Sequence, residues 1–377
     1  MTVLPDSVLP DGHGGRLRID LGAIAANWRA LSERASGAEC AAVVKANAYG
    51  LGMERVAPAL HAAGARSFFV AHLAEGVALR AVLGPDAAIH VLNGIPPGTA
   101  ARFDAHALLP VLNSLNQVAE WSALADALGR TLPAALQFDT GMSRFGLSPA
   151  DADTLEREPW RLERVSVILA MSHLGCADTP DHPANTQQRA AFEGLRARFA
   201  FPRWSLAASS GIFLQSAFHY DLVRPGAALY GVPPSAARPN PMRPVIRLEG
   251  RVVQCREIPA GAWVGYGATH VAARDSLIAT VAVGYADGFL RAGSGRGAAV
   301  LPGWPGELPI IGRISMDCLA VDATGVDPAL LPEGAALELI GPTRRLEDAA
   351  EAAGTIGYEM LTALGARYGR TYEGQGS

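Results

Sequence analysis

The chain has 377 residues, long enough for one large domain or two ordinary domains with sizeable cores. Hydrophobic residues make up 49% and charged residues 18%, a composition that excludes a disordered, collagenous or coiled-coil protein. The net charge is −4, with acidic and basic residues interleaved, so the sequence predicts neither a nucleic-acid surface nor a polybasic membrane patch. A small molecule is the expected partner.

The sequence gives no sign of targeting to a membrane or of secretion. No stretch approaches the roughly 20 apolar residues of a membrane span, and the N-terminal residues lack a basic region followed by an apolar run. We therefore expect a cytoplasmic protein that does not enter a membrane. The cysteines lie far apart without a CxxC pair, which predicts reduced thiols and neither a metal site nor a disulfide framework: Cys40, Cys176, Cys255 and Cys318.

From about residue 20 to residue 235, short apolar runs alternate with longer segments of helical period. Asp20 is a candidate N-cap for a helix that has Ile24, Trp28 and Leu31 on one face. Strand-like runs follow at 41–45, 67–71, 89–93, 108–112, 135–139, 166–171, 203–207 and around Leu222. Helix-like stretches lie between them, for example at 54–63, 74–83, 115–128 and 187–199.

This order of about eight β/α units predicts a TIM (β/α)8 barrel. An open doubly wound sheet would give a similar order. The barrel is favoured because no GxGxxG string follows the first predicted strand.

The pattern changes after the segment 233–244, which holds five of the 26 prolines. Beyond it, runs at 245–254, 277–283 and 337–340 are separated by Gly and Pro turns, which predicts a β-rich domain. Two late helices are expected, at 346–353 and 356–368. We place the barrel in residues 1–240 and the β-rich domain in residues 241–377, with the residues before about 20 as candidates for pairing with the second domain.

Lysine usage singles out one residue before any motif is considered, because Lys45 is the only lysine among 32 basic residues. A bias that exchanges Lys for Arg explains the arginines but not the lysine that remains. An arginine stays protonated, whereas a lysine amine can attack a carbonyl and form an imine. Lys45 ends the first predicted strand, where a polar residue points into the mouth of a barrel. A lysine that reaches solvent from the end of a strand is the alternative interpretation.

Two later segments are typical of a phosphate site. Ser209–Gly211 follows the seventh predicted strand and Arg224–Ala227 follows the eighth, where barrels frequently bind phosphate through backbone N–H groups. Taken alone, Ser210 is more often an ordinary N-cap than a phosphate ligand. An imine-forming lysine together with a phosphate cradle is the combination that pyridoxal phosphate requires.

Eight short strings then identify a resemblance. The string VVKANAYGLG at 43–52 resembles the lysine motif of the alanine racemases. Seven more strings follow in the family's order: DTGMSRFG at 139–146, SHLGCAD at 172–178, RPGAALYG at 224–231, GYGAT at 265–269, GYADG at 284–288, GRISMD at 312–317 and GYE at 357–359. The resemblance implies a fold-type III pyridoxal phosphate enzyme with an N-terminal barrel and a C-terminal β domain. It also implies a homodimer with shared active sites, and an isomerase that supplies D-alanine for peptidoglycan.

The resemblance implies a role for each matching position. Lys45 would bind pyridoxal 5'-phosphate and act as one base, and Tyr266 of the other subunit would act as the second. The phosphate ligands would be Tyr49, Ser210, Gly226, Ala227 and Tyr358, with His173 supporting the cofactor and Arg224 facing its pyridine nitrogen. Arg144 and the backbone N–H of Met316 from the opposite chain would bind the substrate carboxylate, and Tyr285 with Tyr358 would form the gate to the pocket.

The implied mechanism is chemically coherent. Racemisation removes a proton from one face of Cα and returns one to the other face, so it needs two bases. Both a lysine amine and a tyrosine phenol have pKa values near 10 unless desolvation or nearby cations lower them. An arginine at the pyridine nitrogen does not give up its proton, so the ring should stay neutral and side reactions should be limited.

The sequence departs from the family at three positions. Gln137 stands where many members carry a lysine that becomes carbamylated beside the carboxylate-binding arginine. A neutral amide can orient Arg144 by hydrogen bonding but lacks the charge of a carbamate, so we expect chloride or another anion to compensate. Ser209 replaces a common Asn and Ser315 a frequent Cys, which are small changes.

Three other functions share part of this pattern. Decarboxylases of the same fold use a Glu at the pyridine nitrogen and a Cys from the partner subunit, and Arg224 with Tyr266 argues against that reading. A non-enzymatic pyridoxal phosphate carrier would resemble the barrel alone. A racemase of broader specificity differs only in the width of its pocket, which the sequence does not give.

Overall fold

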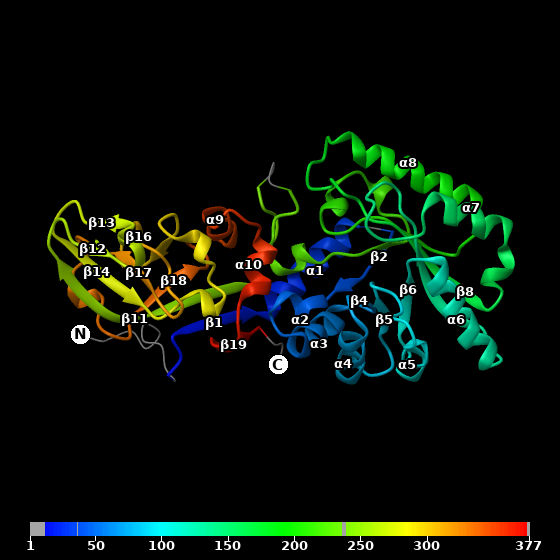
Figure 1. Ribbon diagram of the computed structural model, residues 1–377, viewed down its shortest axis with the longest axis horizontal. Coiled ribbons are helices and arrows are strands. Elements are labelled where there is room, and N and C mark those ends of the chain that lie inside the picture. The colour runs from blue at the N-terminus through cyan, green and yellow to red at the C-terminus, as the bar shows by residue number, and fades with distance from the viewer. Residues whose placement is uncertain (1–11, 36, 236–238, 375–377) are drawn as a thin grey trace. The chain divides into compact units, whose positions relative to one another are not determined.

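The computed structural model describes residues 12–35, 37–235 and 239–374, which fall into two units (Figure 1). One unit is Ile24–Arg243, and the other joins the segment that ends at Ala23 to the chain from Pro244 onward. Within the described residues, no helix has the length and apolar character needed to cross a membrane. The first residues of the segment expected to pair with the second domain, 1–11, lie outside the described residues.

Parallel strands form a barrel in the unit Ile24–Arg243. Neighbouring strands follow the order β3-β4-β5-β6-β7-β8-β9 in a seven-stranded sheet, and β10 pairs with β2. The backbone N–H of Arg224 donates to the oxygen of Ala207 at 2.9 Å, and that of Val43 to the oxygen of Pro225 at 3.0 Å. These bonds connect the last strands to the first and close the barrel. The strands are β2 (Glu39–Cys40), β3 (Ala42–Val43), β4 (Ser67–Val70), β5 (Ala88–Val91), β6 (Leu109–Leu112), β7 (Leu132–Gln137), β8 (Val165–Met171), β9 (Trp204–Ser205) and β10 (Leu222–Val223).

Helices connect successive strands and cover the outside of the barrel (Figure 1). Asp20 caps the first of them as expected, because its Oδ1 accepts the N–H of Ala23 at 2.8 Å. Ile24 and Leu31 of this helix are fully buried. The helices are α1 (Leu21–Arg34), α2 (Lys45–Tyr49), α3 (Met53–Ala63), α4 (Leu73–Leu83), α5 (Ala100–Ala105), α6 (Leu115–Ala127), α7 (Pro149–Arg157) and α8 (Pro183–Arg198).

Apolar side chains from alternate strand positions fill the barrel. This core contains Ala41, Val43, Phe69, Val111, Ala135, Leu169, Met171 and Leu222. His90 pairs in register with Phe69, and the two rings stack with their centroids 4.5 Å apart. Because the interior is packed, the chemistry of a barrel is confined to its ends, where the loops begin.

The second unit is built on an eight-stranded, mainly antiparallel sheet of order β14-β17-β16-β15-β18-β11-β1-β19. Strand β1 (Gly15–Asp20) pairs antiparallel with β11 and parallel with β19, so the N-terminal strand belongs to this sheet. The remaining elements are β11 (Ile246–Ile258), β12 (Trp263–Val264), β13 (His270–Val271), β14 (Ser276–Val281), β15 (Ala298–Val300), β16 (Glu307–Ile311), β17 (Leu319–Asp322), β18 (Ala336–Ile340), α9 (Leu346–Ala352), α10 (Gly357–Ala363) and β19 (Gly369–Glu373).

The predicted fold class, a TIM barrel followed by a mainly β domain, is confirmed. Several predicted boundaries differ from the structure, among them those of β7, α8 and β9. Two of the differences have a clear structural cause. The helix expected at 356–368 ends at Ala363, because Leu364 leaves the helical region and the N–H of Gly365 bonds the oxygen of Asp287 at 2.9 Å. The first strand ends at Val43 rather than at Lys45, because the chain enters a left-handed turn.

Candidate active site

A left-handed turn carries Lys45 out of the first barrel strand. Lys45 begins α2, and the four residues after it have φ between 53° and 54°: Ala46, Asn47, Ala48 and Tyr49. Each such residue other than glycine costs about 1–2 kcal/mol. Such strain persists only where surrounding contacts fix the conformation, and it is typical of functional sites.

The environment of Lys45 favours a neutral amine. Burial lowers the pKa of Lys45 below its ordinary value, and the positive charge of Arg144 lowers it further. The carboxylate of Glu75 acts in the opposite direction. Because a lysine amine must lose its proton before it can attack a carbonyl or accept a proton, this balance suits a nucleophile and a base.

Arg224 is a buried cation within the barrel. Its side chain is 3% exposed and donates hydrogen bonds to Ser205 Oγ and, at 2.6 Å, to the backbone oxygen of Ser172. Burial lowers the pKa of Arg224 to about 9, which still leaves it charged at neutral pH.

His173 follows β8 and stays neutral. Its ring is only partly exposed, and burial lowers its pKa to about 3, helped by the charges of Arg224, Arg144 and Lys45. The electrostatic interactions among these four side chains place them in one region of the barrel unit. The sequence analysis selected all four, from strings that lie far apart along the chain.

The loops after β9 and β10 meet at a set of backbone N–H groups. Ser209 Oγ accepts the N–H of Gly226 at 3.0 Å and that of Ala228 at 3.1 Å, which ties the two loops together. The N–H of Gly226, proposed as a phosphate ligand, is therefore already paired. Within the described residues, the N–H groups of Ser210 and Ala227 have no protein acceptor, and each residue begins a 3-10 helix: Ser210–Phe213 and Ala227–Tyr230.

Gly226 also leaves room for Tyr49. A Cβ added to Gly226 would lie 2.4 Å from Tyr49 Oη, so only glycine lets the phenol approach this loop. The Tyr49 ring packs on Tyr230 with centroids 4.7 Å apart, and Tyr230 in turn donates to the oxygen of Val43 at 3.0 Å. The N–H donors of Ser210 and Ala227, unpaired among the described residues, fit an anion such as a phosphate group.

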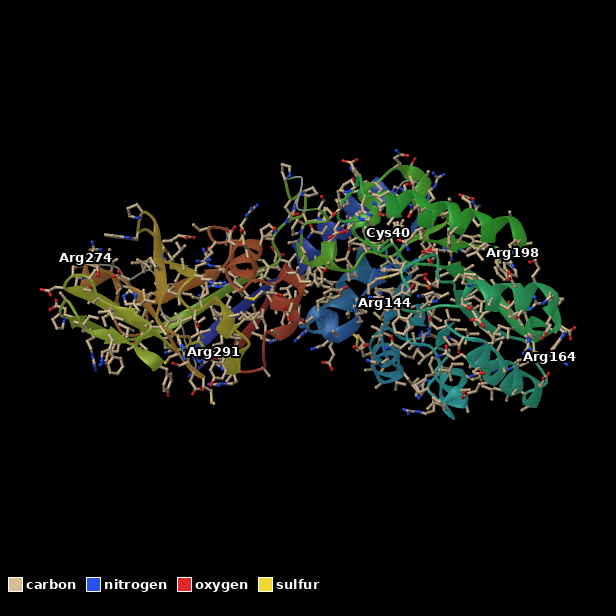
Figure 2. The ribbon with its side chains drawn as sticks, turned by 45° about the horizontal axis from the view of Figure 1, so that its top comes forward. Cys40, Arg144, Arg164, Arg198, Arg274 and Arg291 are labelled. Atoms are coloured by element: carbon tan, nitrogen blue, oxygen red, sulfur yellow. The ribbon has the colours of Figure 1, made fainter. Side chains whose placement is uncertain are left out.

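Arg144 lies in the loop after β7 (Figure 2). Asp139 Oδ1 accepts three consecutive N–H groups of this loop at 2.9–3.1 Å, from Gly141, Met142 and Ser143. The guanidinium of Arg144 is exposed, lies 5.8 Å from the centroid of the Phe145 ring and forms no ion pair with any described residue. Figure 2 places it well away from Arg198, which binds Asp153 and Glu156 on the outer helices. Arg144 is thus available to a ligand carboxylate.

Gln137 is buried, with 7% of its surface exposed. Its backbone oxygen accepts the N–H of Leu147 at 2.8 Å, but its side-chain amide bonds neither Arg144 nor any other described residue. The hydrogen bond considered in the sequence analysis is therefore absent. Orientation of Arg144 must come from other groups of this loop or from a bound anion.

Gln188 is a buried residue that bonds the loops of the candidate site and was not predicted from the sequence. It is 4% exposed on α8, and its Nε2 donates to the oxygen of His173 at 2.9 Å while its Oε1 accepts the N–H of Gly175 at 2.8 Å. Nε2 also lies 3.5 Å from Thr140 Oγ1, which is 2.7 Å from Ser172 Oγ. This amide therefore joins the loop of Arg144 to that of His173. No motif marks it, because a buried glutamine looks like any other polar residue of an amphipathic helix.

The second unit presents its own candidate residues at its surface. Tyr266 is 71% exposed in the turn between β12 and β13, and Met316 is 53% exposed. The backbone oxygens of Ser315 and Met316 accept the N–H groups of Tyr285 and Ala286 at 3.0 and 2.9 Å. This pairing fixes the strings GYADG and GRISMD side by side. Tyr285 and Tyr358 are also exposed, so neither aromatic ring is used in the core of its own unit.

A single lysine at the mouth of a parallel barrel, with N–H groups left unpaired by the described residues on the loops after β9 and β10 and a following β domain, is the arrangement expected of fold-type III pyridoxal phosphate enzymes. Within the described residues, no group of three or more His, Cys, Asp or Glu side chains could hold a metal ion. Residues 19–234 match the family described as "Alanine racemase, N-terminal domain", and residues 245–372 match "Alanine racemase, C-terminal domain".

Comparison with individual proteins gives the same result. The chain is 51% identical over 362 residues to an alanine racemase of Methylobacterium nodulans, covering 96% of each chain. It is 49% identical over 363 residues to a catabolic alanine racemase of Agrobacterium fabrum, covering 96% of this chain and 92% of that one. It resembles the crystal structure of the Bartonella henselae alanine racemase with covalently bound pyridoxal phosphate, with a TM-score of 0.92, 42% identity and coverage of 97% and 100%. The chain belongs to the alanine racemase family, which confirms the resemblance.

Proposed function

We propose that this protein is a pyridoxal-phosphate-dependent alanine racemase in which Lys45 attaches the cofactor. The observation that carries the proposal is the position of Lys45. The only lysine of the chain is partly buried at the barrel mouth, where burial and Arg144 lower its pKa. The match to the alanine racemase family and the relatives near 50% identity that are named alanine racemase support the same proposal.

The residues present fit the cofactor. The N–H groups of Ser210 and Ala227 and the hydroxyl of Tyr49 would hold its phosphate, and Arg224 would face the pyridine nitrogen. When bound, pyridoxal phosphate would supply an electron sink for the charge left on Cα after proton removal. Arg224 can only donate a hydrogen bond, so it leaves the ring nitrogen without an added proton.

Two side chains would move the protons. The Lys45 amine would take or return a proton on one face of Cα, and the phenol of Tyr266 of the partner subunit on the other face. Arg144 and the N–H of Met316 from the partner subunit would bind the alanine carboxylate, which would fix Cα between the two bases. Tyr285 and Tyr358 would form the gate, and their size favours a small substrate over a broader range of amino acids.

Exposed apolar residues support a homodimer. Trp263 pairs in register with Val271 and is 66% exposed, Val271 is 56% exposed, and Tyr266 lies in the same hairpin. Exposed apolar residues that cluster in this way are typical of an interaction surface, and a second copy of the chain would bury them. We propose that the dimer is cytoplasmic. D-Alanine supply for peptidoglycan is the predicted role, and a D-alanine requirement after gene disruption would support it over a catabolic one.

Chemical labelling tests the proposed function directly. Borohydride reduction of the loaded protein, followed by peptide mapping, should give one adduct, on Lys45. Added L-alanine should lose its optical rotation completely, without release of carbon dioxide. Gas and an amine would instead indicate the decarboxylase, and an unreactive loaded protein would indicate the carrier.

A further inference from the structure

Helix α4 presents one carboxylate to the turn that carries Lys45. Glu75 Oε1 accepts the N–H of Ala46 at 2.6 Å. Its Oε2 accepts the N–H of Ala71 at 2.8 Å and that of His72 at 3.1 Å. One side chain thus joins the loop after β3 to the loop after β4.

The turn needs such a contact because its conformation is unfavourable for residues other than glycine. Later in the turn, Asn47 Oδ1 accepts the N–H of Met53 at 2.8 Å, and the ring of Tyr49 packs on Tyr230. At the start of the turn, directly after Lys45, the backbone N–H of Ala46 donates to the side chain of Glu75. A carboxylate suits this position because its two oxygens can serve both loops, whereas an amide has one acceptor oxygen.

The negative charge of Glu75 also acts on Lys45. Its charge raises the pKa of Lys45, against burial and Arg144, which lower it. Glu75 therefore limits how far the pKa of the amine is lowered, besides holding the backbone.

We propose that Glu75 is a positioning residue that fixes the left-handed turn 46–49, so that the Lys45 amine and the Tyr49 hydroxyl are presented together to the cofactor. This inference rests on the proposed function, in which Lys45 attaches pyridoxal phosphate. Glu75 itself touches neither substrate nor cofactor. It acts through the backbone of Ala46.

Hydrogen exchange of the full-length protein tests the proposal without any assay of activity. In Glu75→Gln, the peptide covering 44–53 should exchange about tenfold faster, while peptides of β7 and β8 keep their protection. The matched control is Glu120→Gln. Glu120 accepts the N–H of Gly98 at 2.9 Å, the same kind of bond in a different loop, so its loss should leave the exchange of 44–53 unchanged.

Titration of the stripped protein with pyridoxal phosphate gives the second measurement. Glu75→Gln should weaken binding about tenfold, and Glu120→Gln should not. Unchanged exchange at 44–53, a uniform rise across the whole chain, or faster exchange with unchanged binding would each overturn the proposal. Failure of the wild-type protein to bind the cofactor would contradict the proposed function instead, and the exchange measurement would still decide whether Glu75 holds the turn.

Discussion

Acid should destabilise the barrel through His90, and His90→Phe should remove part of this sensitivity. His90 is 3% exposed and stacked on Phe69 in the barrel interior. Its Nδ1 has no hydrogen-bond partner among the described residues. Burial lowers the pKa of His90 to about 3, and the charges of Arg203 and Arg224 act in the same direction.

The sign and size of the effect follow from the two pKa values. The unfolded chain binds a proton near the ordinary histidine pKa of 6.5, whereas the folded chain does so only near pH 3. The contribution of neutral His90 to the free energy of unfolding is therefore fully present above pH 6.5. It decreases as the pH falls below 6.5, and the decrease ends near pH 3. Each pH unit in this window costs about 1.4 kcal/mol, so pH 5 costs about 2 kcal/mol at His90 alone.

Urea denaturation of the cofactor-free protein at pH 7.5 and pH 5, at one fixed protein concentration, measures this difference. The loss of unfolding free energy between the two values should be about 2 kcal/mol smaller in His90→Phe than in the wild-type protein. His106→Phe, at the end of α5, controls for the loss of a histidine elsewhere. An equal pH dependence in wild type and His90→Phe would refute the reasoning, because it would mean that this ring is not kept neutral by the fold.

Four further predictions concern the site. Lys45→Arg keeps the positive charge but should abolish both racemisation and borohydride-stable labelling, and activity that survives would contradict the assigned role. Arg224→Glu should increase transamination, measured as pyruvate released per racemisation event; no increase would exclude the restraint assigned to this cation. Gln188→Met should lower kcat/KM for alanine about 10- to 100-fold, since lost buried hydrogen bonds cost about 1–3 kcal/mol, and should do so mainly through KM; an unchanged KM would contradict it. Replacing chloride in the buffer by a bulky anion should raise the KM for alanine. In Gln137→Lys, a carbamylated lysine would supply the negative charge, so the KM should depend less on chloride. Electron density showing only amide and water beside Arg144 would argue against a bound anion.

The order of the strands could be predicted because each one is a short apolar run between polar helices. The geometry of the Lys45 turn could not be predicted. Ala46 and Ala48 are good helix formers, and nothing in their side chains indicates φ near 54°. Contacts outside the turn hold that conformation: the bond from the N–H of Ala46 to Glu75, the packing of Tyr49 on Tyr230, and the bond from the N–H of Met53 to Asn47 Oδ1.

The candidate site divides in the same way. Lys45, Arg224 and Tyr266 could be identified because reactive residue types stand in long, specific strings. Glu75 left a weak signal, since an acidic residue in the first turn of a helix is a common capping residue. Gln188 gave no signal in the sequence, because the three loop atoms that its side chain bonds come together only in the folded barrel.

The charges at the barrel mouth explain why one ligand class fits it. Lys45, Arg144 and Arg224 interact with one another or with His173 electrostatically, and His173 stays neutral. Glu75 is the one carboxylate among the groups that act on Lys45, and its oxygens are already used by backbone N–H groups. A ligand that carries a phosphate and an amino-acid carboxylate would bring negative charge into this positive region, with the carboxylate at Arg144. Burial and the charge of Arg144 lower the pKa of the Lys45 amine before the ligand arrives. The cation that would attract the ligand carboxylate therefore also favours the neutral lysine that must attack the cofactor.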